Sequence, residues 1–446
     1  MSASLEKLLR NARIDLIISR VEKDSSIINE IINYLNSESR SVRFNAILVL
    51  GELGSKSEAA IDDLIVCLRD DDWSVCRESA RTLGKIGNVA EKAISELTNH
   101  IDDKEVSIRK AVVVTLGRIG SAKHEAILNL IKALNDESAE VRIEAANSLG
   151  KIGTDAYDAI SDLMEALKDV SWEVRSAAAE AISEIGRNTE KAIPALINAL
   201  GDDDWRVRYR VIDTLVEIGE ASIPSLLNVL DHEDPIIRKT AAETLGDLQI
   251  PDPKVIQNLS KLLDDKNEAV RGKAADALKN IGEEGLFGLI KHLESANKSM
   301  KRTILSAIGG MRLKAQSGVK DVIVYLNDNK ESVRAEAAIT LGKIGINSEN
   351  AVRALEQALK DPKSKVRHEA ALALGNIGEN AKKAVPSLLE ALNDKNPDVR
   401  WRASEALGKL GVKTPDVLSS LETLIHDECD YVCESAINAI DNIEEN

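Results

Sequence analysis

Apolar residues recur along the chain with a helical spacing, and this pattern itself repeats at longer intervals. In the segment 141–153, apolar or small residues fall at every third or fourth position, which predicts one buried face of an α-helix. Of the twelve intervals between successive copies, ten are 33 residues and two are 30. The copies begin at Val42, Val75, Ile108, Val141, Val174, Val207, Ile237, Val270, Met300, Val333, Val366, Val399 and Val432. Such a period predicts an array of thirteen structural repeats.

Each repeat is predicted to hold two helices. The segment 192–200 is typical of the first helix, and Pro194, Pro224 and Pro386 fall in its first turn, where a missing N–H costs nothing. A turn rich in Asp follows. The second helix begins near the first residue of each copy, which we number as position 0. It ends in Gly-x-Ile-Gly, where Gly favours a left-handed C-cap.

Neither helix can bury its apolar face alone, so neighbouring repeats must stack. The fold class predicted is all-α: an α-solenoid of about thirteen two-helix repeats with an N-terminal capping helix. Residues 1–25 are expected to form the cap, with one polar helix from Leu5 to Val21. Residues 26–446 are expected to form one continuous domain.

The repeat carries a recognisable motif. Its consensus, Asp-x-x-Trp-x-Val-Arg-x-x-Ala-Ala-x-x-Leu-Gly-x-Ile-Gly, resembles the short HEAT-like repeats first named from phycobilin lyases. That resemblance implies a structural ladder, in which Asp at position −5 and Arg at position +1 tie adjacent repeats together. The central members of this ladder would be Asp136, Arg142, Asp169, Arg175, Asp202 and Arg208.

The resemblance also places the second helices on a concave face, with positions −2, −1, +2, +3, +6 and +10 pointing outward. All four Trp residues lie at these positions, although aromatics make up only 2% of the chain. Large aromatic and Arg side chains are typical anchors of protein interfaces. We therefore predict a partner-binding face formed by Phe44, Trp73, Arg77, Arg81, Trp172, Trp205, Arg206, Tyr209, Arg210, Trp401, Arg402 and Tyr431. A structural alternative is that each Trp simply covers the adjacent turn.

Charge is uneven along the same positions. Repeats one to three place six basic residues there against two acidic ones, whereas repeats four to eight place five against eleven. The predicted face therefore has a basic N-terminal end and an acidic middle, which would orient a partner of complementary charge. Solubilising surface charge is the alternative explanation.

Composition sets limits on function. The formal net charge is −16, which argues against nucleic acid as a partner, since nucleic-acid binders are commonly basic. Four Cys are too few for a disulfide scaffold and indicate free thiols in a reducing compartment. The start of the sequence has no apolar signal segment, and no apolar run is long enough to span a membrane. We expect a soluble, cytoplasmic, monomeric protein.

The sequence offers few candidates for catalytic or metal-binding motifs. No Gly-x4-Gly-Lys-Ser/Thr loop is present. The pair His368-Glu369 resembles the His-Glu motif of the di-iron enzyme deoxyhypusine hydroxylase, but the equivalent positions of the other repeats lack His. The residues His426, Cys429 and Cys433 match no strong zinc spacing. We therefore predict no cofactor, no metal and no catalytic residue.

Three functions remain open. The first is a non-catalytic scaffold that binds a partner protein in the concave groove. The second, implied only by the resemblance, is a phycobilin-lyase-type enzyme or enzyme subunit. The third is binding of a nucleic-acid backbone by the basic repeats one to three.

The ninth repeat is the least regular. It has Ser295 and Lys301 at the two ladder positions, and Gly at 285, 288, 309 and 310 within its helices. Because Gly weakens helices, we predict a flexible point near residues 283–311.

Overall fold

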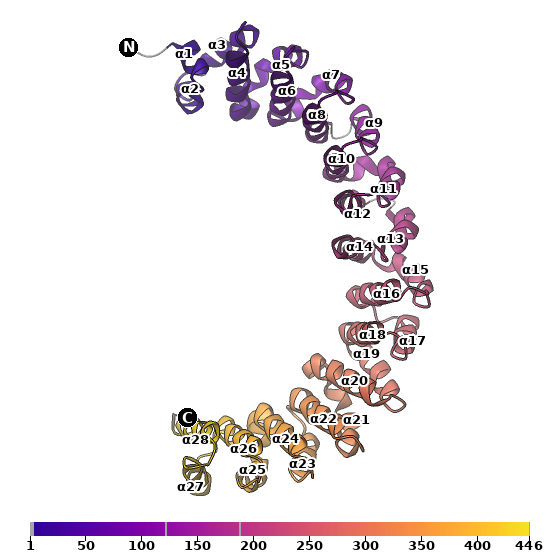
Figure 1. Cartoon of the computed structure of the whole chain (residues 1–446), viewed down its shortest axis with the longest axis vertical. Helices are drawn as coiled ribbons and strands as arrows, with labels where there is room; N and C mark the ends of the chain where they lie inside the picture. Colours follow the sequence, from indigo (N-terminus) through magenta and orange to yellow (C-terminus); the bar gives the residue numbers. More distant parts are fainter. Residues whose placement is uncertain (1–3, 121–122, 187–188, 446) are drawn as a thin grey trace. The chain divides into compact units, whose positions relative to one another are not determined.

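The computed structural model describes residues 4–120, 123–186 and 189–445, and every regular element in these ranges is a helix (Figure 1). The chain divides into two compact units, Met1–Ser225 and Leu226–Asn446. The predicted all-α class, with helices packed in pairs as a solenoid, is confirmed. That residues 26–446 form one continuous domain stays a prediction. Within the described ranges, no helix is long and apolar enough to cross a membrane.

In the first unit, the second helices of the repeats form one layer and the first helices the other (Figure 1). The second helices are α4 (Arg40–Leu53), α6 (Trp73–Ile86), α8 (Val106–Ile119), α10 (Ala139–Ile152), α12 (Trp172–Ile185) and α14 (Trp205–Ile218). The first helices are α3 (Ile27–Asn33), α5 (Ile61–Cys67), α7 (Ile94–Asn99), α9 (His124–Ala133), α11 (Ile160–Ala166) and α13 (Ile193–Ala199). Short 3₁₀ segments adjoin them at η1 (Tyr34–Asn36), η2 (Gly54–Ala60), η3 (Asn88–Ala93), η4 (Gly153–Ala159), η5 (Thr189–Ala192) and η6 (Gly219–Ser222).

The second unit repeats this plan. Its second helices are α16 (Pro235–Leu248), α18 (Glu268–Ile281), α20 (Lys298–Met311), α22 (Glu331–Ile344), α24 (Ser364–Ile377), α26 (Pro397–Leu410) and α28 (Asp430–Glu445). Its first helices are α17 (Pro253–Leu262), α19 (Glu283–Leu293), α21 (Val319–Ile323), α23 (Glu349–Ala358), α25 (Val385–Ala391) and α27 (Pro415–Leu424), with η7 (Arg312–Gly318), η8 (Val324–Asn327) and η9 (Gly378–Ala384) beside them. Helix α15 (Ile223–Asn228) spans the boundary between the units.

The N-terminal cap differs from its prediction. Instead of one polar helix from Leu5 to Val21, the chain forms α1 (Leu5–Arg10) and α2 (Ile14–Val21), separated at Ala12, which has a φ of 50°. The break lets both short helices turn apolar residues onto α4. Leu9 of α1 and Ile17 of α2 are completely buried. The burial of Leu9 and Ile17 against α4, rather than the polar residues between them, therefore explains why this segment forms two helices.

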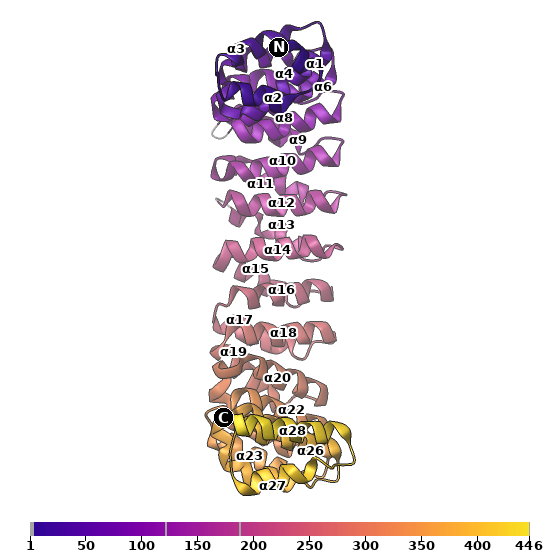
Figure 2. The ribbon, with the colours of Figure 1, turned by 90° about the vertical axis from the view of Figure 1, so that its left-hand side faces the viewer.

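Within each unit, consecutive second helices pack closely because the residues between them are small (Figure 2). Position +9 is usually Gly, and position +7 of the next repeat is Ala, Ser or Thr. A Cβ added at Gly342 would lie 2.8 Å from the Cα of Ala373, closer than real Cβ contacts occur. Several +7 hydroxyls also donate to the carbonyl at position +5 of the preceding repeat, as Thr340 Oγ1 does to Leu305 O at 2.9 Å. This contact between successive second helices, the seam, therefore requires small residues, and a Ser or Thr at position +7 can add a hydrogen bond across it.

The Asp and Arg side chains of the predicted ladder bridge neighbouring repeats. Arg142 donates from Nε and Nη2 to both carboxylate oxygens of Asp169, at 2.7 Å each, and from Nη1 to the Asp136 carbonyl at 2.9 Å. Asp169 also accepts the Ser171 N–H at 2.8 Å, so it orders the start of the next second helix. The same bidentate contact is made by Arg43–Asp70, Arg109–Asp136, Arg175–Asp202, Arg238–Asp265, Arg334–Asp361, Arg367–Asp394 and Arg400–Asp427.

The ladder changes at the irregular repeats. Arg208 donates to the carbonyls of Asp202 and Asp203, and the following repeat has His232 where others have Asp. Arg271 donates to the carbonyls of Asp265 and Lys266, and the next ladder position is Ser295. Both changes coincide with the 30-residue intervals.

Other substitutions keep part of the ladder contact. Lys301 replaces Arg and makes one contact to Asp328 at 2.8 Å. Cys76 and Cys433 donate to the carbonyls of Asp70 and Asp427 instead.

The glycines of the ninth repeat's first helix lie in tight packing. A Cβ at Gly285 would lie 1.9 Å from the Leu278 carbonyl, and one at Gly288 would lie 2.7 Å from Ser260 Oγ. These glycines let α19 approach α17 and α18 closely. The predicted flexibility near 283–311 stays a prediction.

Most second helices end at a Gly of positive φ, but among these glycines only Gly186 and Gly411 adopt the predicted left-handed αL conformation, and two helix ends have no positive φ at all. Gly120 and Gly345 have φ of −95° and −89°. A Cβ at Gly120 would lie 2.3 Å from that of Ala126, so a close approach, not backbone conformation, requires Gly there. Conversely, Arg312 adopts a φ of 52° where other repeats have Gly, a conformation that side chains rarely take.

The same Gly-to-Ala change should have opposite effects at two helix-interior positions. Gly272 in α18 has open space around it, so Gly272→Ala should raise the free energy of unfolding by about 1 kcal/mol through helix propensity. Gly342→Ala in α22 should lower it by about 1–2 kcal/mol, because the new methyl group meets Ala373. Native-state hydrogen exchange of the α18 and α22 amides measures both changes. Effects of the same sign would contradict the close-approach argument.

Replacing a ladder arginine should lower the free energy of unfolding more where that arginine contacts a carboxylate than where it contacts only carbonyls. Arg367 and Asp394 are about 8% and 11% exposed, so Arg367→Met leaves a nearly buried carboxylate without its partner and should cost about 3 kcal/mol. The matched control is Arg271→Met, which removes hydrogen bonds to carbonyls alone and should cost about 1 kcal/mol. Hydrogen exchange in α24 and α18, respectively, reports the two losses, and equal losses would mean that the carboxylate contact adds nothing.

The contribution of the ladder carboxylates to the free energy of unfolding should be lost in acid. Burial alone would raise the pKa of Asp394, but the hydrogen bonds from Arg367 and from the Asn396 N–H outweigh burial and hold that pKa below its usual value of 3.8. A carboxyl whose pKa is lowered by folding stabilises the fold above its ordinary pKa, and this contribution disappears as the pH falls through the lower folded value. The stability difference between wild type and Asp394→Asn should therefore be full at neutral pH and shrink below about pH 4. Urea unfolding monitored by hydrogen exchange in α24 tests this, and a difference that does not change with pH would oppose it.

Candidate functional site

Three of the predicted tryptophans open a second helix. Trp73, Trp172 and Trp205 are the first residues of α6, α12 and α14. Trp73 is 46% exposed and Trp205 65% exposed, whereas Trp172 is half-buried. The residue before each helix, Asp72, Ser171 or Asp204, acts as its N-cap, so position −2 is fixed in space by the start of the helix.

Arginines lie over two of these indole rings. The Arg206 guanidinium is 3.4 Å from the centroid of Trp172, in the neighbouring repeat, which explains why Trp172 is the least exposed of the three. Asp204 holds the same guanidinium at 2.7 Å, and hydrogen bonds from Arg206 lower the pKa of Asp204 to about 2. Arg77 lies 5.0 Å from the Trp73 ring. Stacked arginines of this kind are held in a fixed orientation.

Tyr209 and Arg210 extend the same surface along α14. Tyr209 is 58% exposed, and Arg210 lies 3.4 Å from Glu180 on α12 and 3.9 Å from Asp213. Together with Trp172, Trp205 and Arg206 they form the α12–α14 patch. The structure brings these five predicted residues onto two adjacent second helices (Figure 2).

A second aromatic group lies in the other unit. Trp401 contacts Tyr431 edge to face at 5.9 Å between ring centroids, and Arg402 lies 3.7 Å from the Trp401 ring. His368 Nε2 accepts a hydrogen bond from Arg402 Nε at 3.1 Å, and its ring is 6.1 Å from Trp401. Phe44, the remaining predicted aromatic, is half-buried on α4 and lies apart from both groups.

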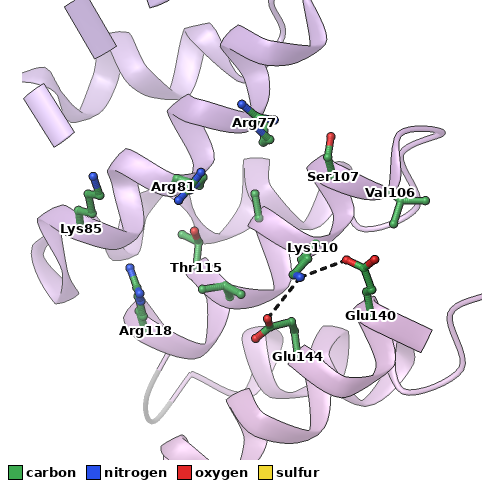
Figure 3. Close-up of a pocket in the computed structure, with 12 residues that line it drawn as sticks. Arg77, Arg81, Lys85, Val106, Ser107, Lys110, Thr115, Arg118, Glu140 and Glu144 are labelled. Atoms are coloured by element: carbon green, nitrogen blue, oxygen red, sulfur yellow. Dashed lines mark hydrogen bonds and ion pairs between the residues drawn. The ribbon is translucent and has the colours of Figure 1, made fainter. Parts of the chain in front are cut away.

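The basic end of the predicted face contains a pocket of about 630 Å³ on α6, α8 and α10 (Figure 3). Figure 3 shows Arg77, Arg81 and Lys85 projecting from α6, with Lys110 and Arg118 on α8. Glu140 and Glu144 of α10 lie on one side, 3.1 and 3.7 Å from Lys110 Nζ. The pocket is therefore lined by basic side chains on α6 and α8 and by acidic side chains on α10.

One of the six basic residues at the outward positions of repeats one to three, Arg40, does not line this pocket. It forms an ion pair with Asp72 at 3.0 Å and donates to Ser74 at 2.7 Å. The charged lining residues are among those counted at the outward positions from the sequence, whereas Val106, Ser107, Ala111, Val114 and Thr115 were not assigned to a site. Periodicity could have found Val106, Ser107, Ala111 and Val114, because they occupy the outward positions −2, −1, +3 and +6 of the third repeat.

The candidate metal residues make other contacts. Cys433 Sγ donates to Asp427 O at 3.2 Å, and His368 Nδ1 lies 3.5 Å from Glu369. Within ranges 4–120, 123–186 and 189–445, no group of three or more His, Cys, Asp or Glu side chains is arranged to hold a metal ion. Burial raises the pKa of Cys67 to about 12 and that of Cys76 to about 11, so neither thiol is an activated nucleophile.

Paired antiparallel helices that stack through a repeated seam define an α-solenoid. The family model for HEAT repeats matches residues 28–117, 95–183, 160–228, 223–286, 286–375 and 352–441. The chain therefore belongs to the HEAT-repeat family. A search of curated proteins found no match to the chain.

Solved structures with a similar fold include karyopherins. Kap121p bound to Ste12p matches with a TM-score of 0.58 at 16% identity, over 95% of this chain and 53% of Kap121p. Kap121p bound to RanGTP gives 0.55 at 17% identity, over 95% and 52%. Importin beta in a polyethylene glycol condition gives 0.54 at 14% identity, over 95% and 71%. This chain spans about half the length of the Kap121p chain. At these identities the likeness concerns the fold.

Proposed function

We propose that this chain is a non-catalytic scaffold that binds a partner protein on the second-helix face of its repeats. The α12–α14 patch carries the proposal: it combines the strongly exposed rings of Trp205 and Tyr209 with the oriented Arg206. Large rings that folding leaves exposed, beside an arginine whose orientation is already fixed, lose little conformational freedom on binding. The partner we propose is one protein bound by a single copy of this chain.

The fold is compatible with such a role. Kap121p, whose solenoid is similar, has been solved with Ste12p, Nup53p and RanGTP bound. Solenoid repeats offer long surfaces on which the inner positions maintain the stack while the outer ones are free to contact a partner. We place the chain in the short HEAT-like class on its 33-residue period. A bilin-lyase role has no residue in the described chain to support it.

Nucleic-acid binding by the first three repeats is the second candidate, and the basic pocket is the observation that favours it. Phosphate contacts would make such binding strongly salt-dependent. A gel shift at low salt that shows no complex would remove this candidate.

The α12–α14 patch should be required for partner capture. Wild type and the variant Trp172→Ala/Trp205→Ala/Tyr209→Ala are compared by affinity capture from the native lysate, followed by mass spectrometry and by binding assays with the purified partner. We expect at least a tenfold loss of affinity, because truncation of central aromatic anchors commonly costs about 2 kcal/mol or more each. Partner binding equally by both proteins would exclude the patch.

A matched control removes three exposed apolar side chains from the opposite layer. Val66→Ala/Leu128→Ala/Tyr157→Ala changes residues of α5, α9 and η4 that are 63%, 50% and 47% exposed. This variant should bind the partner like wild type. A loss here, with the patch variant unaffected, would move the site to the first-helix layer.

A further inference from the structure

The basic pocket on α6, α8 and α10 contains arginines that the protein itself leaves unneutralised. Arg77 and Arg118 have no carboxylate partner among the described residues, and Arg81 has only Glu78 at 3.7 Å. The Nε of Arg77 is buried and has no hydrogen-bond partner. A buried donor of this kind is costly until a ligand satisfies it, so the pocket is prepared for an acceptor.

The two lysines of the pocket, unlike the arginines, are closely paired with carboxylates of the chain. Lys85 is bound to Glu52 at 2.8 Å, and Lys110 is held between Glu140 and Glu144. The positive charge available to a ligand is therefore concentrated on Arg77, Arg81 and Arg118. Arginine favours carboxylates because its planar fork matches both oxygens of that group.

Part of the pocket wall is apolar. Val106, Ala111 and Val114 of α8 are among its lining residues, and Figure 3 shows Val106 on the same side as Glu140. The volume of about 630 Å³ lies within the range of roughly 300–1,000 Å³ that is usual for ligand sites. A ligand that fits must therefore carry anionic groups next to aliphatic ones.

The arginines, apolar residues and glutamates of the pocket together favour some anionic ligands over others. A nucleic-acid strand carries a phosphate at every step and would bring some of them against Glu140 and Glu144, where like charges repel. Its bases would also find no aromatic side chain among the lining residues on which to stack. A peptide can place carboxylates on the arginines, aliphatic side chains on the valines, and neutral or basic residues beside the two glutamates.

We propose that this pocket binds a short peptide segment of a partner protein in which Asp or Glu residues alternate with Leu, Ile or Val. The proposal rests on the scaffold function above and names the chemistry of one partner segment. The carboxylates bind Arg77, Arg81 and Arg118, and the aliphatic side chains pack on α8.

Selection from a random peptide library on the full chain tests this. Phage-displayed peptides of about ten residues are selected in parallel on wild type and on Arg77→Gln/Arg81→Gln/Arg118→Gln. We expect wild type to enrich acidic residues alternating with aliphatic ones, and the variant not to do so. In fluorescence anisotropy, the best synthetic peptide should bind the variant at least about tenfold more weakly, and its Glu→Gln twin should bind wild type weakly as well.

Two controls keep the test decisive. Lys92→Gln/Lys132→Gln/Lys168→Gln removes the same charge from exposed lysines outside the pocket and should bind the peptide like wild type. If the triple arginine variant unfolds, Arg81→Gln/Arg118→Gln changes only exposed side chains and should still weaken binding severalfold.

The outcomes separate the two proposals. Enriched peptides without acidic residues, or equal enrichment on wild type and variant, would overturn the peptide site. Stronger competition by a single-stranded oligonucleotide than by the peptide would identify the ligand as nucleic acid and overturn it too. Because the α12–α14 patch is tested separately with the captured partner, failure of the peptide site leaves the scaffold proposal standing. Loss of partner capture, in turn, can be told apart from loss of peptide binding.

Discussion

The fold depends on how closely one second helix can approach the next. A single pair of short helices buries too little apolar surface to be stable, so each repeat obtains its core from its neighbours. Small residues at positions +9 and +7 bring the helix backbones together, as at Gly375 against Ala406, where an added Cβ would lie 2.9 Å from the Ala406 Cα. This approach buries the residue at position 0, such as Val366 or Val399, completely. Where position +9 is larger, as at Lys279, α18 packs less extensively on α20.

The Asp–Arg contacts fix how one repeat is aligned with the next. In the regular repeats the arginine donates to a carbonyl of its own inter-helix turn and to the carboxylate of the next turn, as Arg142 does. That carboxylate also accepts the N–H of the N-cap residue of the following helix. Ion pairs that are nearly buried contribute little net stability over an apolar alternative, because removing both charges from water is costly. Their larger effect is to fix the register between repeats, since a displaced repeat would leave both charges buried and unpaired. The two 30-residue intervals have His232 and Ser295 at the ladder position, so this carboxylate contact is missing there.

The sequence predicted the repeat pattern almost completely, because period, helix ends and ladder positions are local properties of residue type. Its failures came from longer-range packing. The break at Ala12 arises because Leu9 and Ile17 must both reach α4, and no local pattern indicates that. Gly120 and Gly345 were interpreted as left-handed caps, yet they are glycines because a neighbouring Ala methyl lies against them. The stacking of Arg206 on Trp172 joins positions −1 and −2 of adjacent repeats, a relation that only the stacking geometry makes visible.

Within each repeat, some positions maintain the fold and others are available to contact a partner. Positions 0, +1, +7 and +9 are committed to core, ladder and seam, so their side chains have little freedom to vary. Positions such as −2, −1 and +2 face away from the seam, and all four Trp residues, Tyr209 and Tyr431 lie there. Arg77 and Arg81 occupy +2 and +6 of one helix, and Arg118 occupies +10 of the next. Because the stack already fixes these helices relative to each other within the first unit, three arginines from two repeats converge on one pocket without any irregularity in the backbone.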